Sequence, residues 1–323
     1  MIKILYPLKF KPILKEKIWG GQKLKALLNK QNDFPNIGES WEISDVDGDT
    51  SIVINGELKR KTLKELLELF KGDLIGEKNY KVFGNKFPLL IKFIDAKEDL
   101  SIQLHPNDEL AKKRHNSFGK TEMWYVMQAD VGSNLIVGFN QKITPETYLN
   151  YLEDKTLPKI LNFDKVKDGD SYFIEVGRVH AIGAGIMLAE IQQTSDITYR
   201  VYDWDRVDDE GNSRDLHNDL AIDAIDFNMK DDFRISYLKA ENQSNQMVSC
   251  PYFTTNFLPL DGIIQKQNEE DSFIIYICVD GEAEISTDLF SEKIKKGEIV
   301  LLPSAIKTYQ ITARNAKLLE VYV

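Results

Sequence analysis

Most of the chain alternates between short apolar runs and turn-forming residues. Runs of this kind cover Leu89–Asp95, Met123–Gln128, Ser171–Val176 and Phe273–Val279. Each has the length of an ordinary β-strand, and most are rich in branched and aromatic side chains. The pattern therefore predicts a fold that is mainly β.

Helical spacing is clear at only a few places. Thr62 and Glu65 form a capping-box pair at the start of the segment TLKELLELF, whose apolar residues recur at helical spacing. Pro145 opens a second amphipathic segment, and Leu216–Phe227 is a third, less periodic candidate. Many strands with a few short helices, and no regular alternation of the two, favour barrels or sandwiches over a doubly wound sheet.

A weak internal repeat divides the chain. The segment GDSYFIE at Gly169–Glu175 resembles GEIVLLP at Gly297–Pro303, and a strand ending in a turn precedes each copy, at Tyr125–Asp130 and at Tyr276–Gly281. Two related copies fit two β-barrels in tandem. We therefore expect a first domain with helical insertions over residues 1-227, and a second barrel over residues 228-323.

The histidines are confined to the first of these domains. The chain has four, and none lies beyond His217. Aligning the two copies places Phe273 at the position of Glu122, and Thr308 at the position of His180. The second barrel would then lack side chains that hold a metal ion, so we expect it to be structural.

The charge of the chain argues against a nucleic acid as its partner. The formal net charge is -10, and no cluster of lysine or arginine is long enough to form a nucleic-acid surface. A small anionic substrate remains compatible with this charge, because a few local cations decide binding inside a pocket.

The remaining bulk features suit a cytoplasmic protein that does not enter a membrane. No apolar run approaches the roughly 18 residues of a membrane span, and the N-terminal stretch lacks the apolar core of a signal peptide. The two cysteines, Cys250 and Cys278, stand in short apolar stretches rather than at metal or redox spacing. We expect both to be reduced and buried.

Three segments carry candidate metal ligands. In SIQLHP, Gln103 and His105 are two residues apart, so on a strand both side chains point to one face. Lys120 and Glu122 share a face in the same way, and GRVHAIG presents His180 between glycines. Two imidazoles, a carboxylate and an amide oxygen form a mixed set suited to zinc, with room for water or substrate.

The other two histidines are expected to have no metal role. His115 lies in a basic, polar stretch that we interpret as a loop, and His217 lies in the third helix candidate. A single histidine is more often an ordinary core or surface residue than a ligand.

Six short segments, in a fixed order, resemble one protein family. They are WGG at Trp19–Gly21, GESWE at Gly38–Glu42, QLHPND at Gln103–Asp108, GKTEMWY at Gly119–Tyr125, VHAIG at Val179–Gly183 and YRVYD at Tyr199–Asp203. Each alone is weak, but the combination resembles the type I mannose-6-phosphate isomerases (phosphomannose isomerases), in particular the short bacterial form. The resemblance runs from about residue 10 to residue 226 and continues loosely to the C-terminus.

This resemblance implies a fold, a cofactor and a reaction. The fold would be a pair of cupin-type (jelly-roll) β-barrels, with one Zn²⁺ per chain. The reaction would interconvert mannose 6-phosphate and fructose 6-phosphate through a metal-stabilised cis-enediol(ate). The oligomeric state stays open between monomer and homodimer. By the same resemblance Arg200 is catalytic, and the zinc ligands are Gln103, His105, Glu122 and His180.

The reaction also needs cations and a base. Lys120 is placed to stabilise negative charge that builds up on the enediolate oxygens, and Arg200 offers a planar fork for those oxygens or for phosphate. Lys92, a charge within an apolar strand, is a further substrate-binding candidate. Glu190 is the candidate general base, with metal-bound water as the alternative.

Several neighbouring residues receive weaker assignments. We expect Trp19, Trp41 and Trp124 to pack in the core rather than to form platforms for a sugar ring. The chain has EVGR before the third ligand segment, where the family commonly has PAGT. Arg178 is therefore a candidate for extending the positive charge of the site, and the role of Asp203 stays open.

Two other functions are compatible with parts of this pattern. Two histidines and one carboxylate also suit a cupin-like iron oxygenase, although Gln103 as a fourth ligand and the nearby cations favour an anionic sugar. A non-catalytic sugar-phosphate-binding barrel would keep the same pocket. The presence of Lys120, Glu122 and Arg200 together argues against that alternative.

Overall fold

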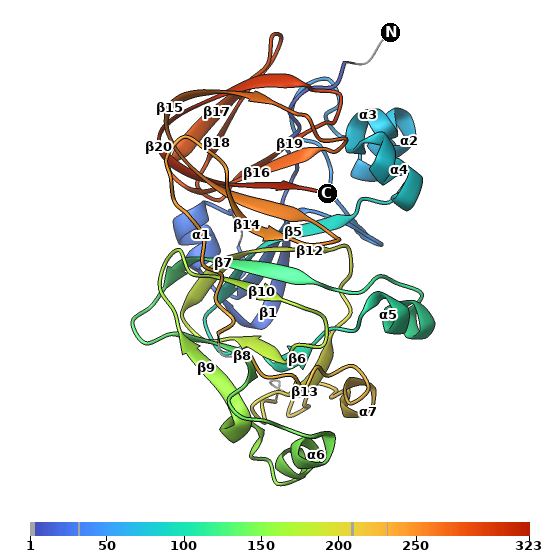
Figure 1. Cartoon of the computed structure of the whole chain (residues 1–323), viewed down its shortest axis with the longest axis vertical. Coiled ribbons are helices and arrows are strands. Elements are labelled where there is room, and N and C mark those ends of the chain that lie inside the picture. Colours follow the sequence, from blue (N-terminus) through green and yellow to red (C-terminus); the bar gives the residue numbers. More distant parts are fainter. Residues whose placement is uncertain (1–3, 32, 208–209, 231) are drawn as a thin grey trace.

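The structure, a computed structural model, describes residues 4–31, 33–207, 210–230 and 232–323 (Figure 1). The strands of the C-terminal part, in orange and red, form the upper half of Figure 1, and the green and yellow strands form the lower half. The prediction of a mainly β fold with few helices is confirmed. The four apolar runs named above each contain a strand, with ends shifted by at most two residues.

Three large sheets carry the fold. The middle sheet has the strand order β1 (Ile13–Gly21), β2 (Ile37–Ile43), β5 (Leu89–Ala96), β12 (Ile186–Gln193), β7 (Glu122–Ala129), β10 (Ser171–Ile174). The lower sheet has the order β13 (Tyr199–Tyr202), β6 (Ile102–Leu104), β11 (His180–Ile182), β8 (Asn134–Phe139), β9 (Leu161–Lys165).

The upper sheet has a path of five strands and a hairpin attached to it. The path runs β14 (Asn245–Ser249), β15 (Thr254–Gln267), β20 (Thr308–Tyr322), β16 (Ile274–Asp280), β19 (Ile299–Leu302). The hairpin, of which one strand pairs with β20, consists of β17 (Glu282–Ser286) and β18 (Ser291–Lys295). A separate two-stranded ribbon joins β3 (Asp45–Val46) and β4 (Asp49–Thr50).

The middle sheet is covered on both faces. Successive side chains of a strand point to opposite faces, and on β5 Ile91 and Phe93 pack into a core shared with the upper sheet. Lys92 and Ile94 point the other way, toward the lower sheet. All eight residues of β5 are therefore buried. This explains why the strand is apolar along its length except at Lys92 and Asp95.

The upper sheet is also covered on both faces. On β16, Ile275 and Ile277 join the core shared with the middle sheet. Tyr276 and Cys278 belong instead to the interior of the C-terminal barrel. The molecule is thus layered from the lower sheet through the middle sheet to the upper sheet and its hairpin (Figure 1).

The helices are short and lie outside these sheets. They are α1 (Lys23–Leu28), α2 (Leu63–Phe70), α3 (Gly72–Ile75), α4 (Glu77–Phe83), α5 (Asp108–His115), α6 (Pro145–Glu153), α7 (Asn218–Ala221) and the 3₁₀ turn η1 (Leu157–Ile160). The first two predicted helices are confirmed as α2 and α6. Thr62 and Glu65 cap α2 reciprocally, as the capping box requires.

The third predicted helix is much shorter than expected. Of Leu216–Phe227, only Asn218–Ala221 is helical. The backbone N–H of Asp226 donates to the carbonyl oxygen of Gly177 at 2.8 Å, so the chain leaves the helical path to meet a neighbouring turn. Phe227 stacks instead on Phe139, at 5.9 Å between ring centroids.

Both copies of the internal repeat form a pair of antiparallel strands, β7 with β10 and β16 with β19. The pairing of these strands shifts the alignment of the two copies by one residue from the alignment expected from the sequence. Glu122 lies opposite Ile174 in the pairing of β7 with β10, and the equivalent partner of Leu302 in the pairing of β16 with β19 is Ile274. The position of Glu122 therefore corresponds to Ile274 rather than to Phe273. Direct alignment of the letters cannot detect this shift, because both residues are apolar.

The two predicted domains, residues 1-227 and 228-323, are in extensive contact. Leu8 forms a β-bridge with Leu301, and the Asp271 carboxylate accepts hydrogen bonds from the N–H groups of Glu77 and Lys78 at the start of α4. The boundary between the domains stays a prediction.

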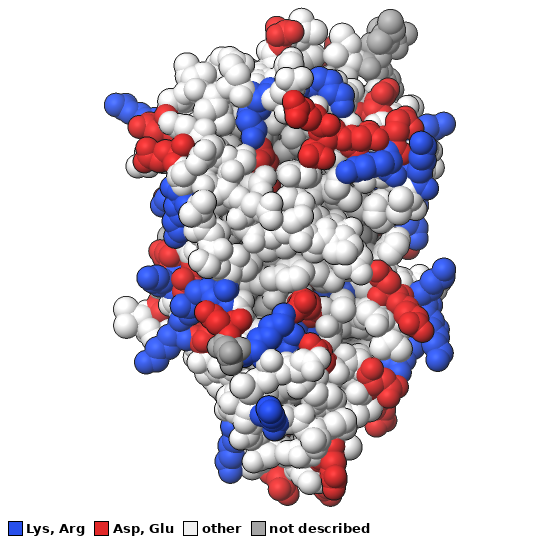
Figure 2. Space-filling model, viewed as in Figure 1, with Lys and Arg blue, Asp and Glu red and all other residues white. Residues whose placement is uncertain are grey.

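The surface carries mixed charge. On the face seen in Figure 2, acidic and basic side chains are interspersed toward the edges, and a broad central area is uncharged. Within the described parts of the chain, no helix is long and apolar enough to cross a membrane.

Candidate active site

A cavity of about 350 Å³ lies between the middle and lower sheets. Strands of both sheets supply its walls, and charged and aromatic side chains dominate them. The side chains that line it include Lys17, Trp19, Glu39, Trp41, Lys92, Ser101, Gln103, Lys120, Trp124, His180, Glu190, Thr198, Arg200 and Arg214.

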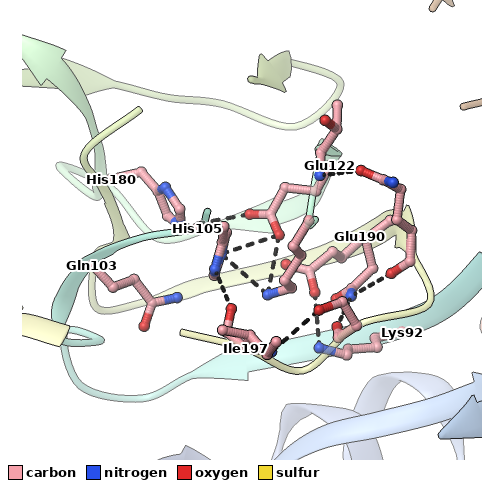
Figure 3. Close-up of polar contacts among 12 residues, drawn as sticks. Lys92, Gln103, His105, Glu122, His180, Glu190 and Ile197 are labelled. Carbon is pink, nitrogen blue, oxygen red and sulfur yellow. Dashed lines mark hydrogen bonds and ion pairs between the residues drawn. The ribbon is translucent and has the colours of Figure 1, made fainter. Parts of the chain in front are cut away.

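Three buried side chains converge beside this cavity (Figure 3). Nε2 of His105 lies 3.5 Å from Oε2 of Glu122, and Nε2 of His180 lies 3.6 Å from Oε1 of the same carboxylate. One potential ligand atom from each of these residues lies within 4.8 Å of the others. Among the described residues, this is the only group of three or more His, Cys, Asp or Glu side chains with such geometry.

Strand register places the fourth candidate ligand beside them. On neighbouring strands of the lower sheet, Gln103 lies directly opposite His180 on one side and directly opposite Arg200 on the other. Directly opposed residues point to the same face of a sheet. The amide of Gln103 therefore lies next to the two imidazoles (Figure 3).

Both imidazoles are oriented by backbone carbonyl groups. Nδ1 of His105 lies 2.8 Å from the carbonyl oxygen of Ile197, and Nδ1 of His180 lies 2.8 Å from that of Arg178. Because a carbonyl oxygen only accepts, each Nδ1 carries the hydrogen and each Nε2 keeps its lone pair for a metal ion. Nε2 of His180 and Oε1 of Glu122 are buried and have no hydrogen-bond partner among the described residues.

Burial sets the protonation of this cluster. It lowers the pKa of His180 to about 4 and that of His105 well below its ordinary value, with the charge of Lys120 adding to the effect at His105. Both rings are therefore neutral at neutral pH, as metal ligation requires. Burial, with the charge of Glu190, raises the pKa of Glu122 to about 7. A bound cation would favour the ionised form of this carboxylate.

Lys120 lies at the edge of the cluster. Its Nζ is 3.2 Å from Oε2 of Glu122 and 3.1 Å from Nε2 of His105. Lys120 stands two residues before Glu122, the first residue of β7, and the contact between the two side chains shows that they point to the same side, as the two-residue spacing predicts. The Lys120 side chain is 5% exposed, so its charge acts with little screening by water.

A second carboxylate faces the cavity from β12. Glu190 lies opposite Lys92 on one side and Trp124 on the other. Lys92 Nζ is 3.1 Å from Oε1 of Glu190, and the indole N–H of Trp124 donates to Oε2 at 3.0 Å. Burial alone would raise the pKa of Glu190, but Lys92 and Lys120 hold it below its ordinary value. Glu190 is therefore ionised at neutral pH.

Lys92 is bound into this network rather than extending to solvent. Burial would lower its pKa, but Glu190, Glu39 and Glu122 keep that pKa above its ordinary value. Its ammonium also lies 5.2 Å from the ring centroid of Trp41. The lysine thus presents a permanent positive charge to the cavity.

Arg200 reaches the cavity from β13. Its Nε donates to the hydroxyl of Ser101 at 3.3 Å, and Nη1 donates to the carbonyl oxygen of Asp215 at 2.8 Å. The structure thus brings all the predicted site residues to one cavity or to its immediate edge.

Arg178 does not extend the positive charge of the site, so that expectation is wrong. Its guanidinium donates to the carbonyl oxygen of Asn228 and pairs with Asp226, both at 2.8 Å, and it is 1% exposed. Gly177, with φ of 80°, turns the chain just before it. The strand alternation that orients His180 therefore does not extend back to Arg178.

The two remaining histidines lie outside the cluster. His115 is the last residue of α5 rather than part of a loop, and its Nε2 lies 2.9 Å from the hydroxyl of Tyr199. His217 precedes α7, and its Nδ1 accepts a hydrogen bond from the backbone N–H of Arg200.

The three tryptophans combine two roles. Trp19, Trp41 and Trp124 are each at most 5% exposed, as expected of core residues, but all three also line the cavity. The expectation of core packing alone was therefore incomplete.

Sequence reasoning also missed several lining residues, although a signal for them exists. Each lies two residues from a residue already under consideration, on the same strand or extended segment. The pairs are Lys17 with Trp19, Glu39 with Trp41, Ser101 with Gln103, and Thr198 with Arg200. Extending the two-residue period outward from each motif would have found them.

The fold and the cavity define a mainly β protein of cupin type with a candidate metal centre. Family models match two parts of the chain. Residues 7–128 match the catalytic domain of phosphomannose isomerase type I, and residues 243–323 match the cupin domain of mannose-6-phosphate isomerase.

Curated relatives cover nearly the whole chain. The mannose-6-phosphate isomerase ManA of Bacillus subtilis is 35% identical over 310 residues, which are 94% of this chain and 95% of that protein. The mannose-6-phosphate isomerase of Streptococcus mutans is 34% identical over 94% of each chain. The chain belongs to the type I mannose-6-phosphate isomerase family.

Solved structures agree with this assignment. The crystal structure of the mannose 6-phosphate isomerase from Bacillus subtilis matches with a TM-score of 0.89 at 30% identity, over 98% of this chain and 99% of that one. The phosphomannose isomerase of Salmonella typhimurium, at 15% identity, shares the fold with a TM-score of 0.79 over similar lengths. The resemblance seen in the motifs is therefore confirmed, and the iron oxygenase alternative is not supported.

Proposed function

We propose that this protein is a zinc-dependent isomerase that interconverts mannose 6-phosphate and fructose 6-phosphate in the cytoplasm. The observation that carries the proposal is the convergence of His105, Glu122 and His180 beside a cavity lined by cations. Family membership supports the reaction, and the cavity supports a small anionic substrate. A non-catalytic binding barrel would not need a buried carboxylate such as Glu190 beside the metal centre.

The proposed metal ligands are Gln103, His105, Glu122 and His180. Two neutral imidazoles, a carboxylate and an amide oxygen suit zinc. Nε2 of His180 and Oε1 of Glu122, which accept no hydrogen bond from any described residue, fit a bound cation. Zinc held there would supply a Lewis acid that draws electron density from the substrate carbonyl group.

Glu190 is the proposed general base. In the direction from mannose 6-phosphate, the C2–H bond of the open-chain sugar breaks, and its electrons form the C1–C2 double bond of a cis-enediol(ate). At the same time the π electrons of the C1 carbonyl group move to O1. The ionised carboxylate takes the C2 proton and returns it at C1, while the hydroxyl proton of O2 passes to O1, so that C2 becomes the carbonyl carbon and the substrate keeps all its protons. Lys92 and the Trp124 indole hold the carboxylate in place.

Lys120 and Arg200 are the proposed stabilisers of negative charge. Lys120 is the cation nearest the ligand set, where negative charge develops on the enediolate oxygens. Arg200, on the far side of Gln103, is placed to bind the phosphate group or the oxygens of the sugar chain. Lys92 contributes a further positive charge to substrate binding.

The proposed function is tested by turnover and metal content together. The purified protein is stripped with a chelator, reloaded with zinc, and assayed with mannose 6-phosphate in a coupled reaction that detects fructose 6-phosphate. We expect the stripped protein to be inactive and the reloaded protein to be active. Undetectable turnover by the zinc-loaded protein would favour a binding barrel.

A further inference from the structure

Asp203 is a nearly buried carboxylate that binds two arginines just after β13. It is 6% exposed. Its Oδ2 accepts from Nε of Arg214 at 2.7 Å, and its Oδ1 accepts from Nη2 of the same guanidinium at 2.6 Å. Nη2 of Arg206 donates to Oδ1 as well, at 2.6 Å. The bond to Arg214 is a two-pronged, charge-assisted pair, which fixes the orientation of that guanidinium.

Only one of these two arginines faces the cavity. Arg206 also donates to the carbonyl oxygen of Asp99 at 2.7 Å, and it does not line the cavity. Arg214 lines the cavity, and its side chain keeps 30% exposure. Arg214, which lines the cavity, is therefore held by Asp203, which does not line it.

Arg214 also lies close to Arg200. Burial lowers the pKa of Arg200, and the neighbouring charge of Arg214 lowers it further. Asp203 accepts from Nε and from one terminal nitrogen of Arg214, which leaves Nη1 without a bond to it. Two guanidinium groups on one cavity wall repel each other, and an anion placed between them would relieve that repulsion.

The cavity wall that carries Arg200 and Arg214 lies about one substrate length from the candidate metal centre. His180, Gln103 and Arg200 occupy one register level on three neighbouring strands. Arg200 is therefore two strand spacings, about 10 Å, from His180. That separation matches the far end of an open-chain hexose phosphate whose carbonyl end lies at the metal centre.

We propose that Asp203 is a positioning residue that holds Arg214 in the cavity wall, and that Arg214 so held binds the phosphate dianion of the substrate together with Arg200. The identity of the ligand as a sugar phosphate rests on the proposed function. The contact between Asp203 and Arg214 does not.

The test uses a ligand that the enzyme cannot convert. Sorbitol 6-phosphate carries the phosphate but has no carbonyl group, so calorimetric binding to the zinc-loaded protein reports the anion site without turnover. Arg214→Gln should weaken this binding by about 10- to 100-fold, as expected for loss of a charge-assisted hydrogen-bonded contact. Asp203→Asn should weaken binding to a similar extent, because the Arg214 guanidinium loses the carboxylate that fixes its orientation.

Kinetics separate positioning from a general loss of structure. Both variants should raise KM for mannose 6-phosphate by the same factor, with a smaller change in kcat and with zinc retained. The double variant should be no worse than Arg214→Gln alone, because Asp203 acts through that side chain. Arg234→Gln is the control, since Arg234 contacts the Tyr172 hydroxyl outside the cavity. It should leave KM unchanged.

The outcomes distinguish this inference from the proposed function. Arg214→Gln that binds sorbitol 6-phosphate as tightly as the parent protein overturns the inference, even if Asp203→Asn fails to fold. Additive losses in the double variant overturn the positioning role of Asp203. A parent protein that binds sorbitol 6-phosphate through Arg214 but does not isomerise mannose 6-phosphate overturns the proposed function and leaves the inference standing.

Discussion

Two-residue spacing along strands explains most of the individual residues in the cavity. Gln103 with His105 and Lys120 with Glu122 follow from this spacing, so the sequence alone could predict that each pair shares a direction. It could not predict that His180 joins them. That contact depends on the pairing of β11 with β6, two strands separated by about 75 residues of sequence. The residue types alone made His180 a candidate ligand, and the family resemblance strengthened that assignment.

Contacts between strands that are far apart in the sequence could not be predicted either. The ion pair of Lys92 with Glu190 joins β5 to β12, and a buried lysine in a sequence does not name its partner. Arg178 shows the opposite error. It stands two residues before His180, but it directly follows the turn at Gly177 and lies outside β11, which begins at His180, so the alternation of side chains along a strand does not apply to it.

Arg200→Ala should lower kcat by about 100- to 1,000-fold, the effect of removing one preorganised donor from developing negative charge. Zinc should stay bound, because Arg200 contacts Ser101 and the backbone rather than the ligand atoms. Steady-state kinetics and elemental analysis of the same preparation check both statements. Loss of zinc in this variant would mean that Arg200 supports the metal centre structurally.

At the scale of elements, strands were easier to predict than helices. The central strands of the middle sheet, β5, β7 and β12, are buried almost throughout and give long, mostly apolar runs. Helix α5 gives no such signal, because Ala111 is its only buried residue. Its ends do carry signals, since the Asn107 side chain caps its first turn and basic residues fill its last turn. Helix α7 ends early because a contact with another segment overrides local preference.

The C-terminal barrel contains a carboxylate at the position equivalent to Glu190. Glu190 lies opposite Trp124, and Glu320 of β20 lies opposite Tyr276 of β16. Oε1 of Glu320 accepts from the hydroxyl of Tyr276 at 2.6 Å and pairs with Lys266 at 2.7 Å. The same strand pairing thus supports a cavity in one barrel and a filled polar interior in the other.

Glu320→Gln should destabilise the protein by about 1–3 kcal/mol at neutral pH, through loss of charge-assisted hydrogen bonds. Burial opposes ionisation of Glu320, but Lys266 and its hydrogen-bond donors keep its pKa below the ordinary value. A lowered folded-state pKa stabilises the protein above the unfolded-state pKa of about 4.3. That contribution disappears as the pH falls through the folded-state pKa.

Urea unfolding of the parent and the Glu320→Gln variant checks this pH dependence. The difference in unfolding free energy should be large at neutral pH and should shrink toward about pH 3, below the ordinary carboxyl pKa. Glu282→Gln, at an exposed position of β17, is the matched control and should change little. An equal loss at both pH values would show that charge at Glu320 does not matter.

At the scale of the whole molecule, the middle sheet connects the candidate active site to the rest of the fold. One face of it supplies Lys92, Trp124 and Glu190 to the cavity, and the other packs on the upper sheet. The internal repeat predicted two related halves, but not that they would share one core. Such sharing depends on which faces of remote strands meet, and that information is spread over the entire sequence.

The most direct test of the central claim measures zinc content and isomerase activity together in the parent protein and in His180→Ala. We expect one zinc ion per chain and full activity in the parent protein, and loss of both in the variant while it stays folded. His115→Ala, which changes a histidine outside the cluster, should keep both. Stoichiometric zinc in His180→Ala, or full activity in a zinc-free parent protein, would contradict the account.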